Sequence, residues 1–233
     1  MKRFLTAEWR DLIMANYEVP PKLLADRVPA GTDLDLYDGH CFVSLVGFMF
    51  LDTRVMDFLV PFHINFEEVN LRFYVRREVR DELRRGVVFV KEIVPRAAIA
   101  MIARTLYGEP YERWLMSHNR DALNVRYSWE KGACRNSISV ESGKNIGVPD
   151  EGSHAEFIIE HYWGYTKRRG GRTDEYKVEH PKWELFEAGN PRIDVDFGCT
   201  YGPEFAFLNN EEPYSVVLAK GSDISVYKGE KIV

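Results

Sequence analysis

The sequence contains no long apolar run and no export signal. No segment of its 233 residues approaches the roughly 18 consecutive apolar residues that a membrane-spanning helix requires. The N-terminal stretch MKRFLTAEWRDL begins with basic residues, but it lacks the continuous apolar core and the small-residue cleavage site of a signal peptide. We therefore expect a soluble, cytoplasmic protein with no membrane partner.

Cysteine is scarce, and no strong excess of positive charge is present. The three cysteines, Cys41, Cys134 and Cys199, form an odd set without CxxC spacing, which favours free thiols in a reducing compartment over a disulfide framework. The net charge is −5, so the chain has no electrostatic feature that attracts nucleic acid. We expect free thiols and no nucleic-acid partner.

The familiar motifs of nucleotide binding and hydrolysis are also absent. The sequence has no GxGxxG or P-loop pattern, no GxSxG elbow around a serine and no HExxH pair for zinc. As a strand, HAEFIIEH would place His154, Glu156 and Glu160 on one face. It lacks the helical arrangement of the zinc motifs, however, and a metal site normally needs three or four convergent ligands. We expect neither a metal nor a cofactor.

Aromatic and aliphatic residues, in contrast, are plentiful. The chain has 14 Phe, 12 Tyr and 5 Trp residues within a hydrophobic share of 45%, which is enough to fill one large core. Because all-β domains often reach this length, we expect one domain over residues 1–233. Helices are predicted only for PPKLLADRV and for Pro95–Leu106. Antiparallel strands are predicted near residues 9–17, 41–51, 65–76, 87–94, 124–129, 137–141, 156–166, 175–179 and 183–187, with a terminal hairpin turning at Gly221-Ser222.

The segment NFEEVNLRFYVR, residues 65–76, organises the prediction because its alternate positions differ in character. A strand turns Glu68, Asn70 and Arg72, followed by Tyr74, to one face and apolar residues to the other. This polar row can line a wet pocket. The pattern by itself favours the alternative, an exposed sheet face on which Glu68 and Arg72 pair with each other.

Lys91 is a second candidate because it lies in the apolar strand VVFVKEIV. Burial there would lower the pKa of its amine and make it nucleophilic. A lysine near a strand end more commonly extends its ammonium group to solvent, and the sequence fixes no second cation beside Lys91. A catalytic Lys91 is therefore the less favoured interpretation.

Several segments resemble one protein family over nearly the whole length of the chain. WRDL, LDLYDGHCFVSLVGF, FEEVNLRFYVR, GVVFVKEI, EHYWGYTKR and HPKW together are similar to the YqjF-like proteins, a domain family of unknown function. That family is similar in fold to acetoacetate decarboxylase. The resemblance implies a mainly β (α+β) fold with a few short helices, in which an antiparallel sheet forms a barrel-like cone around a buried pocket.

The resemblance also implies pocket residues. Arg10, in Arg10-Asp11-Leu12, stands where the decarboxylase arginine meets the substrate carboxylate, and Glu68 matches a pocket glutamate. In ARTLYGEPYERW, Tyr111 and Glu112 occupy the positions of the decarboxylase lysine pair. Neither can form the imine on which that decarboxylation depends. The implied pocket residues are Arg10, Glu68, Asn70, Arg72, Tyr74, Tyr111 and Glu112, and the catalytic candidates are Glu68, Tyr111 and Lys91.

Three functions follow from these expectations. The leading one is binding of a small organic molecule, with an anion among the options, in a pocket without Schiff-base chemistry. The first alternative is an enzyme that uses Glu68 as a general acid or base and Arg10 or Arg72 as an anion clamp. The second is a structural or regulatory module that binds a protein partner. A pocket with a pKa-shifted Glu68 would favour catalysis, and a large exposed apolar patch would favour the partner module. Homo-oligomerisation is left open.

Overall fold

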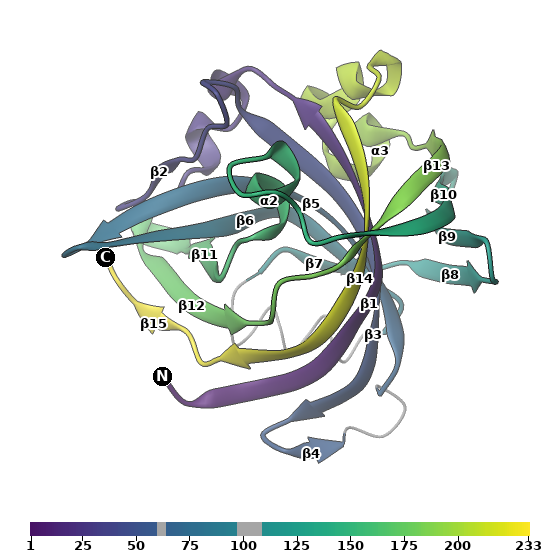
Figure 1. Cartoon of the computed structure of the whole chain (residues 1–233). Coiled ribbons are helices and arrows are strands. Elements are labelled where there is room, and N and C mark those ends of the chain that lie inside the picture. The colour runs from purple at the N-terminus through teal and green to yellow at the C-terminus, as the bar shows by residue number, and fades with distance from the viewer. Residues whose placement is uncertain (60–63, 97–108) are drawn as a thin grey trace.

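The computed structural model describes residues 1–59, 64–96 and 109–233, and it consists mainly of β-strands (Figure 1). The strands are β1 (Arg3–Glu18), β2 (Asp33–Leu34), β3 (Phe42–Val55), β4 (Phe58–Leu59), β5 (Phe66–Val79), β6 (Glu82–Val94), β7 (Tyr111–Arg113), β8 (Leu115–Arg120), β9 (Asn124–Lys131), β10 (Cys134–Gly147), β11 (Trp163–Lys167), β12 (Thr173–Glu179), β13 (Leu185–Asp194), β14 (Ser215–Tyr227) and β15 (Glu230–Lys231). The helices are α2 (His154–Ile159), α3 (Phe197–Tyr201) and the short 3-10 helices η1 (Pro21–Leu23), η2 (Ala25–Arg27), η3 (Arg169–Gly171) and η4 (Pro203–Asn210). The predicted mainly β fold is confirmed. Within the described ranges, no helix has the length and apolar content needed to cross a bilayer.

The strands form one sheet that curves around the interior of the molecule (Figure 1). Its order is β15-β12-β11-β6-β5-β3-β1-β14-β13-β10-β9-β8, and β2, β4 and β7 pair with β5, β3 and β6. β12 also pairs with β14, where Val178 lies opposite Val226. The path of pairings that leaves β12 through β11, β6, β5, β3 and β1 therefore returns to it through β14. We call these seven the ring strands.

β1 and β14 bend together where they pair. Asp11 has a φ of 55° and Gly221 a φ of 76°, and Gly221 lies opposite Arg10. Left-handed residues in a strand are typical of bulges, which bend the strand and increase its twist. The bend allows β14 to pair with β13 at Leu218 and with β12 at Val226.

The ring strands separate two hydrophobic cores. Val69, Leu71 and Phe73 of β5 belong to an outer core, which β9, β10, α3 and η4 cover. Phe66 and Tyr74 belong to an inner core, to which α2 adds apolar side chains. β3 is buried on both faces from Phe42 to Phe50, as predicted. Burial of apolar surface contributes about 25 cal/mol per Å², so both faces of the curved sheet are stabilised by packing.

Several predicted elements take another form. PPKLLADRV forms η1 and η2 instead of one helix. The strand predicted from Glu156 begins instead as α2. Ser153 accepts a hydrogen bond from the Glu156 backbone and the Glu156 carboxylate accepts one from Gly152, and such capping contacts fix a helix start. The predicted terminal hairpin is the single strand β14, because Gly221 bends the chain without reversing it. Residues 97–106 of the predicted helix Pro95–Leu106 lie outside the described residues.

A disulfide joins Cys134 of β10 to Cys199 of α3, so the prediction of free thiols is wrong for these two residues. Their Cα atoms are 6.2 Å apart, although 65 positions separate them in the sequence. That Cα distance is usual for a disulfide. The sequence spacing carried no signal because only the folded chain brings β10 and α3 together. Cys41 is free and buried.

Candidate functional site

A cavity of about 150 Å³ lies inside the ring strands, and each of the seven contributes to its lining. The walls are largely apolar, with aromatic side chains that include Trp9, Phe48 and Trp163. The polar side chains come mostly from β5, β6 and the segment around β7. They are Thr53, Glu68, Asn70, Arg72, Glu92, Glu109, Tyr111, His161 and Tyr176.

Three of these side chains form the polar row on β5. Glu68, Asn70 and Arg72 are all buried, at 2%, 2% and 9% exposure, and all line the cavity. Asn70 Nδ2 donates a hydrogen bond to Glu68 Oε1 at 2.9 Å. The strand alternation predicted this shared face, whereas the favoured alternative of a solvated sheet face does not fit their burial.

Tyr111 meets this row from the start of β7. β7 pairs in parallel with β6, and Tyr111 lies opposite Glu92. The Tyr111 hydroxyl donates a hydrogen bond to Glu68 Oε2 at 3.1 Å. Burial, together with the charges of Glu68 and Glu92, raises the pKa of Tyr111 well above its usual value, so the phenol keeps its proton. The residue that the family resemblance matches to a decarboxylase lysine thus faces the cavity as a hydrogen-bond donor.

Glu92 also faces the cavity, and the sequence analysis missed it. β5 and β6 pair with a bulge, because Leu71 lies opposite Lys91 whereas Arg72 lies opposite Phe89. Val90 is therefore an extra residue that reverses the alternation within β6. Phe89 and Glu92 line the cavity, and Lys91 does not. The uninterrupted apolar run VVFV gives no phase from which this reversal could be read.

Glu109 is the second missed carboxyl group. It lies just before β7, is 5% exposed, and accepts a hydrogen bond from the Thr166 hydroxyl at 2.5 Å. Thr166 belongs to β11, on the other side of β6 from β5. A glutamate next to Pro110 reads as a surface turn in the sequence. Only the pairing of β7 and β11 with β6 brings it inside.

Burial controls the ionisation of the three carboxyl groups. It raises the pKa of Glu68 to about 7, against the hydrogen bonds from Asn70 and Tyr111 and the charge of Arg72. It also raises the pKa of Glu109 to about 7, although hydrogen bonds to Thr166 and Tyr176 oppose it. The pKa of Glu92 is raised well above its usual value by burial and then by the charges of Glu109 and Glu68. Burial therefore favours the protonated form of all three carboxyl groups, and for Glu92 the charges of the other two act in the same direction.

Arg72 provides positive charge at this site. Its Nη2 donates to the Ile158 carbonyl at 3.2 Å, and its guanidinium carbon lies 5.7 Å from the centre of the Tyr74 ring. Its Nε is buried and has no partner among the described residues.

Burial lowers the pKa of the neighbouring His161 to about 4, although Asp35 opposes the shift, so the imidazole is neutral at pH 7.

Three implied pocket residues, Arg10, Tyr74 and Glu112, lie elsewhere. Arg10 Nη2 pairs with Glu8 Oε2 at 2.7 Å and does not line the cavity, in contrast to Trp9 and Leu12. The extra residue at Asp11, with its left-handed φ, turns both Trp9 and Leu12 inward and leaves Arg10 on the other face of β1. The prediction that Arg10 contributes a positive charge to the cavity is therefore wrong.

Tyr74 is the second of these residues. It shares the face of the polar row, but it is 1% exposed, lies beyond Arg72 on β5 and does not line the cavity. Its hydroxyl is hydrogen-bonded to Ser44, and its ring lies 4.6 Å from the ring of His161. Tyr74 therefore packs as a core residue that supports Arg72.

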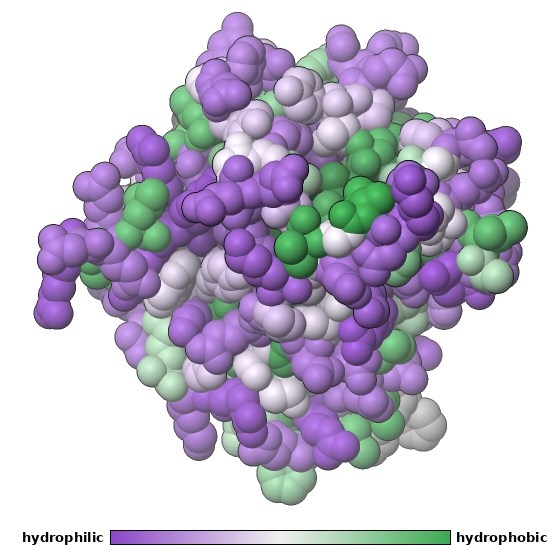
Figure 2. Space-filling view, in the orientation of Figure 1, coloured by the Kyte–Doolittle hydropathy of each residue, from purple (hydrophilic) through white to green (hydrophobic). Residues whose placement is uncertain are grey.

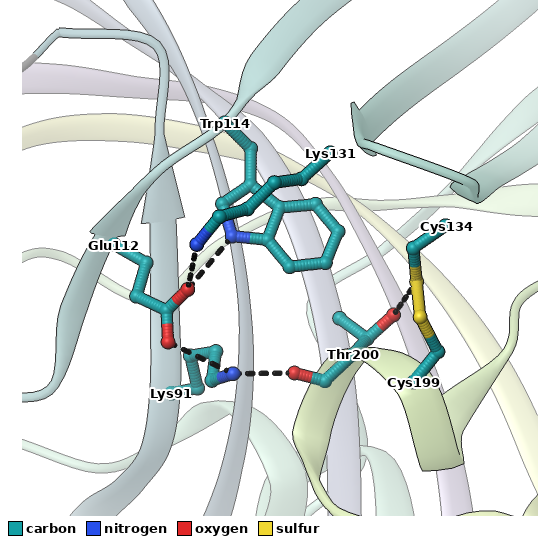
Figure 3. Close-up of polar contacts among 7 residues, drawn as sticks. All are labelled: Lys91, Glu112, Trp114, Lys131, Cys134, Cys199 and Thr200. Atoms are coloured by element: carbon teal, nitrogen blue, oxygen red, sulfur yellow. Dashed lines mark hydrogen bonds and ion pairs between the residues drawn. A yellow bond between two sulfur atoms is a disulfide. The ribbon is translucent and has the colours of Figure 1, made fainter.

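Lys91 and Glu112 lie together on the outer side of the sheet, away from the cavity lining (Figure 3). Lys91 Nζ pairs with Glu112 Oε1 at 3.0 Å and donates to the Thr200 carbonyl of α3 at 2.6 Å. Burial opposes the ionisation of Glu112, but hydrogen bonds from Trp114, Lys131 and Lys91 outweigh it and lower the pKa of Glu112 to about 2. The structure therefore removes Glu112 from the implied pocket and places the catalytic candidate Lys91 outside the cavity.

The cavity has apolar walls and a cluster of hydrogen-bond donors and acceptors. Arg72 and Tyr111 donate, Asn70 Oδ1 accepts, and a protonated Glu92 can donate. Among the residues that the structure describes, no group of three or more His, Cys, Asp and Glu side chains could hold a metal ion. The chemistry available to these side chains is hydrogen bonding and proton transfer between carboxyl and phenol groups.

A family model described as "Uncharacterized conserved protein", DUF2071, matches residues 6–223 of the chain. "Uncharacterized protein YqjF" of Bacillus subtilis (strain 168) is 24% identical over 184 residues, which cover 77% of this chain and 74% of that protein. These matches confirm the predicted family resemblance.

Solved structures share the fold at low sequence identity. Acetoacetate decarboxylase from Legionella pneumophila has a TM-score of 0.71 and 12% identity, over 100% of this chain and 88% of that chain. An acetoacetate decarboxylase-like enzyme from Sphingomonas wittichii RW1 has a TM-score of 0.68 and 12% identity, over 100% and 94%. The enduracididine biosynthesis enzyme MppR has a TM-score of 0.69 and 13% identity, over 100% and 88%. The predicted acetoacetate decarboxylase-like fold is confirmed.

Proposed function

The chain belongs to the DUF2071 family of uncharacterized conserved proteins, and from that premise we propose that it binds a small, uncharged organic molecule in the cavity inside the ring strands. The ligand has an apolar body and a carbonyl or hydroxyl head. The observation that carries this proposal is the joining of apolar walls to one cluster of buried hydrogen-bonding groups around Glu68. Ligand sites are typically apolar cavities with a few convergent polar groups.

The volume sets the size of the ligand. An apolar cavity of about 150 Å³ in another protein accommodates benzene, so a single six-membered ring with one polar substituent suits the 150 Å³ found here. The neighbour MppR forms a complex with pyruvate, which is also a small carbonyl compound. That likeness supports a ligand of this size class and gives no identity.

The charges already present favour an uncharged ligand. Arg72 lies close enough to Glu68 for its charge to favour the ionised carboxylate. A second anion would therefore have to share Arg72 with Glu68 and would also lie near Glu109. A bound cation would in turn compete with Arg72 for Glu68. A neutral carbonyl or hydroxyl group avoids both of these unfavourable interactions and the cost of burying another charge.

The polar atoms without partners support the same conclusion. Asn70 Oδ1, Arg72 Nε and Glu92 Oε2 are buried and have no hydrogen-bond partner among the described residues. Such atoms carry a desolvation cost that a suitable ligand can relieve. Two of the three groups can donate and one can accept, which matches the head group of a ketone or an alcohol.

The closed path of ring strands also supports the barrel-like architecture implied by the family resemblance. Strands from β1 to β15 share one sheet, which supports a single domain over residues 1–233. The partner-binding alternative has less support, since the face in Figure 2 is mainly hydrophilic and its hydrophobic residues form small groups.

A matched ring series tests the proposal. Thermal unfolding is followed with cyclohexanone, cyclohexanol, cyclohexylamine and cyclohexanecarboxylate, which share one ring and differ in head-group charge. A ligand at ten times its dissociation constant adds about 1.4 kcal/mol, which corresponds to a rise in melting temperature of about 3–6 °C. We expect this rise with the ketone or the alcohol and a smaller rise with the charged compounds.

The control is Val87→Phe, which places a larger side chain in the cavity without changing any polar group. This variant should lose the ligand-induced rise in melting temperature. No rise with any of the four compounds would contradict the proposal, and a rise largest with cyclohexanecarboxylate would replace it with anion binding.

A further inference from the structure

We infer that Glu68, Tyr111 and Glu92, which we call the proton relay, interconvert a bound ketone and its enol by transferring protons between carbon and oxygen of the same molecule. This inference rests on the proposed function, because the ketone must occupy the same cavity. The substrate class is a small ketone with at least one hydrogen on the carbon next to the carbonyl group.

The relay is continuous in space. It is formed on adjacent strands, since Glu68 lies on β5, Glu92 on β6 and Tyr111 on β7. The Tyr111 hydroxyl donates to Glu68 Oε2 at 3.1 Å and is also hydrogen-bonded to Glu92. One hydroxyl group therefore links the two carboxyl groups, and each carboxyl group also lines the cavity.

Glu92 has an atom available for the substrate. Its side chain is 2% exposed and Oε2 is without a partner among the described residues. Glu68 differs because both of its oxygens accept hydrogen bonds, from Asn70 and from Tyr111. Hydrogen bonds to both oxygens favour a carboxylate, whereas a buried carboxyl oxygen without a donor favours the acid. The geometry thus assigns the base role to Glu68 and the acid role to Glu92.

The surrounding charges support this division. Arg72 on the same strand favours ionisation of Glu68, and burial together with the charges of Glu109 and Glu68 keeps Glu92 protonated. His161 is neutral at pH 7. Two carboxyl groups with different proton affinities around one cavity are a common arrangement for acid and base catalysis.

The reaction balances without a co-reactant. The Glu68 carboxylate removes a proton from the carbon next to the carbonyl group, and the electron pair of that C–H bond forms the C=C bond of the enol. The π electrons of the C=O bond move to oxygen, which takes the proton of the Glu92 carboxylic acid. Glu68 is then protonated and Glu92 ionised. Tyr111 restores the starting state by giving its proton to Glu92 and accepting the proton of Glu68.

Hydrogen–deuterium exchange at carbon tests the inference. The protein is incubated with cyclohexanone in D₂O at neutral pH, and loss of the protons next to the carbonyl group is followed by NMR against buffer alone. When a relay proton exchanges with D₂O before the enol returns to the ketone, the return places deuterium on the carbon. We expect protein-dependent exchange that falls about 100-fold or more in Glu68→Gln, as for the loss of a general base.

Further variants separate the relay from the fold. Tyr111→Phe and Glu92→Gln should also reduce exchange, while Glu68→Asp should retain part of it because a carboxylate remains. Glu112→Gln is the matched control, since Glu112 adjoins Tyr111 in the chain but lies on the outer side of the sheet with Lys91. It should leave exchange unchanged. Thermal unfolding with and without cyclohexanone shows whether each variant folds and binds.

The outcomes distinguish the two levels of inference. If cyclohexanone binds but the protein does not accelerate exchange, or if Glu68→Gln and Tyr111→Phe bind it and exchange at the original rate, the relay is overturned and the binding function stands. If cyclohexanone does not bind, both the relay and the proposal of an uncharged ketone as ligand are contradicted.

Discussion

Adjacent residues of this chain have opposite electrostatic surroundings. Tyr111 faces the cavity and keeps its proton, whereas Glu112 faces outward and has a pKa lowered to about 2 by Trp114, Lys131 and Lys91, against the effect of burial. Glu92, next to Lys91, has a pKa raised well above its usual value by burial and by Glu109. Neighbouring residues on β6 and on β7 thus face opposite sides of the sheet, and the pKa values of Glu92 and Glu112 are shifted in opposite directions.

The first prediction concerns stability and pH. Because the folded-state pKa of Glu92 is raised, its stabilising contribution is present below about pH 4.5 and is lost as pH rises toward the folded-state pKa. Glu92→Gln cannot ionise and avoids this loss. Between pH 5 and 7, the free energy of unfolding of the variant should therefore increase relative to that of the original protein, by up to about 1.4 kcal/mol for each pH unit. Urea unfolding at a series of pH values measures the difference.

Glu112→Gln is the control for this series. The pKa of Glu112 is lowered in the folded protein, so its stabilising contribution is already complete above pH 4.5. The stability lost on substitution should therefore be constant between pH 5 and 7. Parallel stability curves for Glu92→Gln and the original protein would contradict the raised pKa of Glu92.

The second prediction is that borohydride traps no adduct with acetoacetate. Tyr111 cannot form an imine, and the amine of Lys91 is held outside the cavity by Glu112 at 3.0 Å and by the Thr200 carbonyl at 2.6 Å. The intact mass after incubation with acetoacetate and borohydride should be unchanged. A stoichiometric increase in mass that Lys91→Met abolishes would show that Lys91 reaches the substrate.

At the scale of elements, the bend shared by β1 and β14 depends on Gly221. A Cβ atom there would lie 1.9 Å from the Trp9 carbonyl oxygen, and the residue has a φ of 76°. We predict that Gly221→Ala destabilises the protein by about 3 kcal/mol or more, from the left-handed conformation and from the clash together. Denaturant unfolding measures this loss.

Gly132 offers a matched control, because it has a φ of 63° but no atom within 4 Å of an added Cβ. Gly132→Ala should cost only about 1–2 kcal/mol, from the backbone conformation. Equal losses in the two variants would show that the close approach of Gly221 to Trp9 adds nothing.

The strands could be predicted from the sequence where periodicity was clear. β5 alternates strictly from Glu68 to Val75, and its shared polar face is found in the structure. β3 was also predicted correctly because an apolar run that follows the Asp38-Gly39 turn signal favours a strand covered on both sides. The helix α2 was missed because HAEFIIEH alternates like a strand, and the capping contacts of Ser153 and Glu156 decide its conformation.

The site was predictable only in part, because bulges set which side chains face inward. The extra residue Val90 exchanges Glu92 for Lys91 at the cavity, and Asp11 turns Arg10 away from it. Neither bulged strand has a glycine or proline at the extra residue itself, since these positions are Asp11 and Val90. Glu109 depends on long-range pairing of β7 and β11 with β6, which local sequence does not encode.

At the scale of the whole molecule, the curved sheet has one core inside the ring strands and another outside. The outer core carries the Cys134–Cys199 disulfide, which closes a loop of 65 residues between β10 and α3. The inner core holds the cavity. The cavity and the disulfide therefore lie on opposite sides of the ring strands.

The last prediction follows from that disulfide. Thiol titration of the unfolded, unreduced protein should find one thiol, from Cys41, and titration after reduction should find three. Reduction should also lower the free energy of unfolding by about 4 kcal/mol, as expected for a loop of this length. Three thiols without reduction would show that Cys134 and Cys199 are not joined.

The bulge at Val90 has a consequence for the chemistry of the cavity. If β6 accommodated its extra residue beyond Glu92 instead, Lys91 would lie opposite Asn70 and its side chain would enter the cavity. A carboxyl group and an amine would then exchange places with no substitution of either residue. The position of one bulge in β6 therefore decides whether the cavity receives a carboxyl group or an amine.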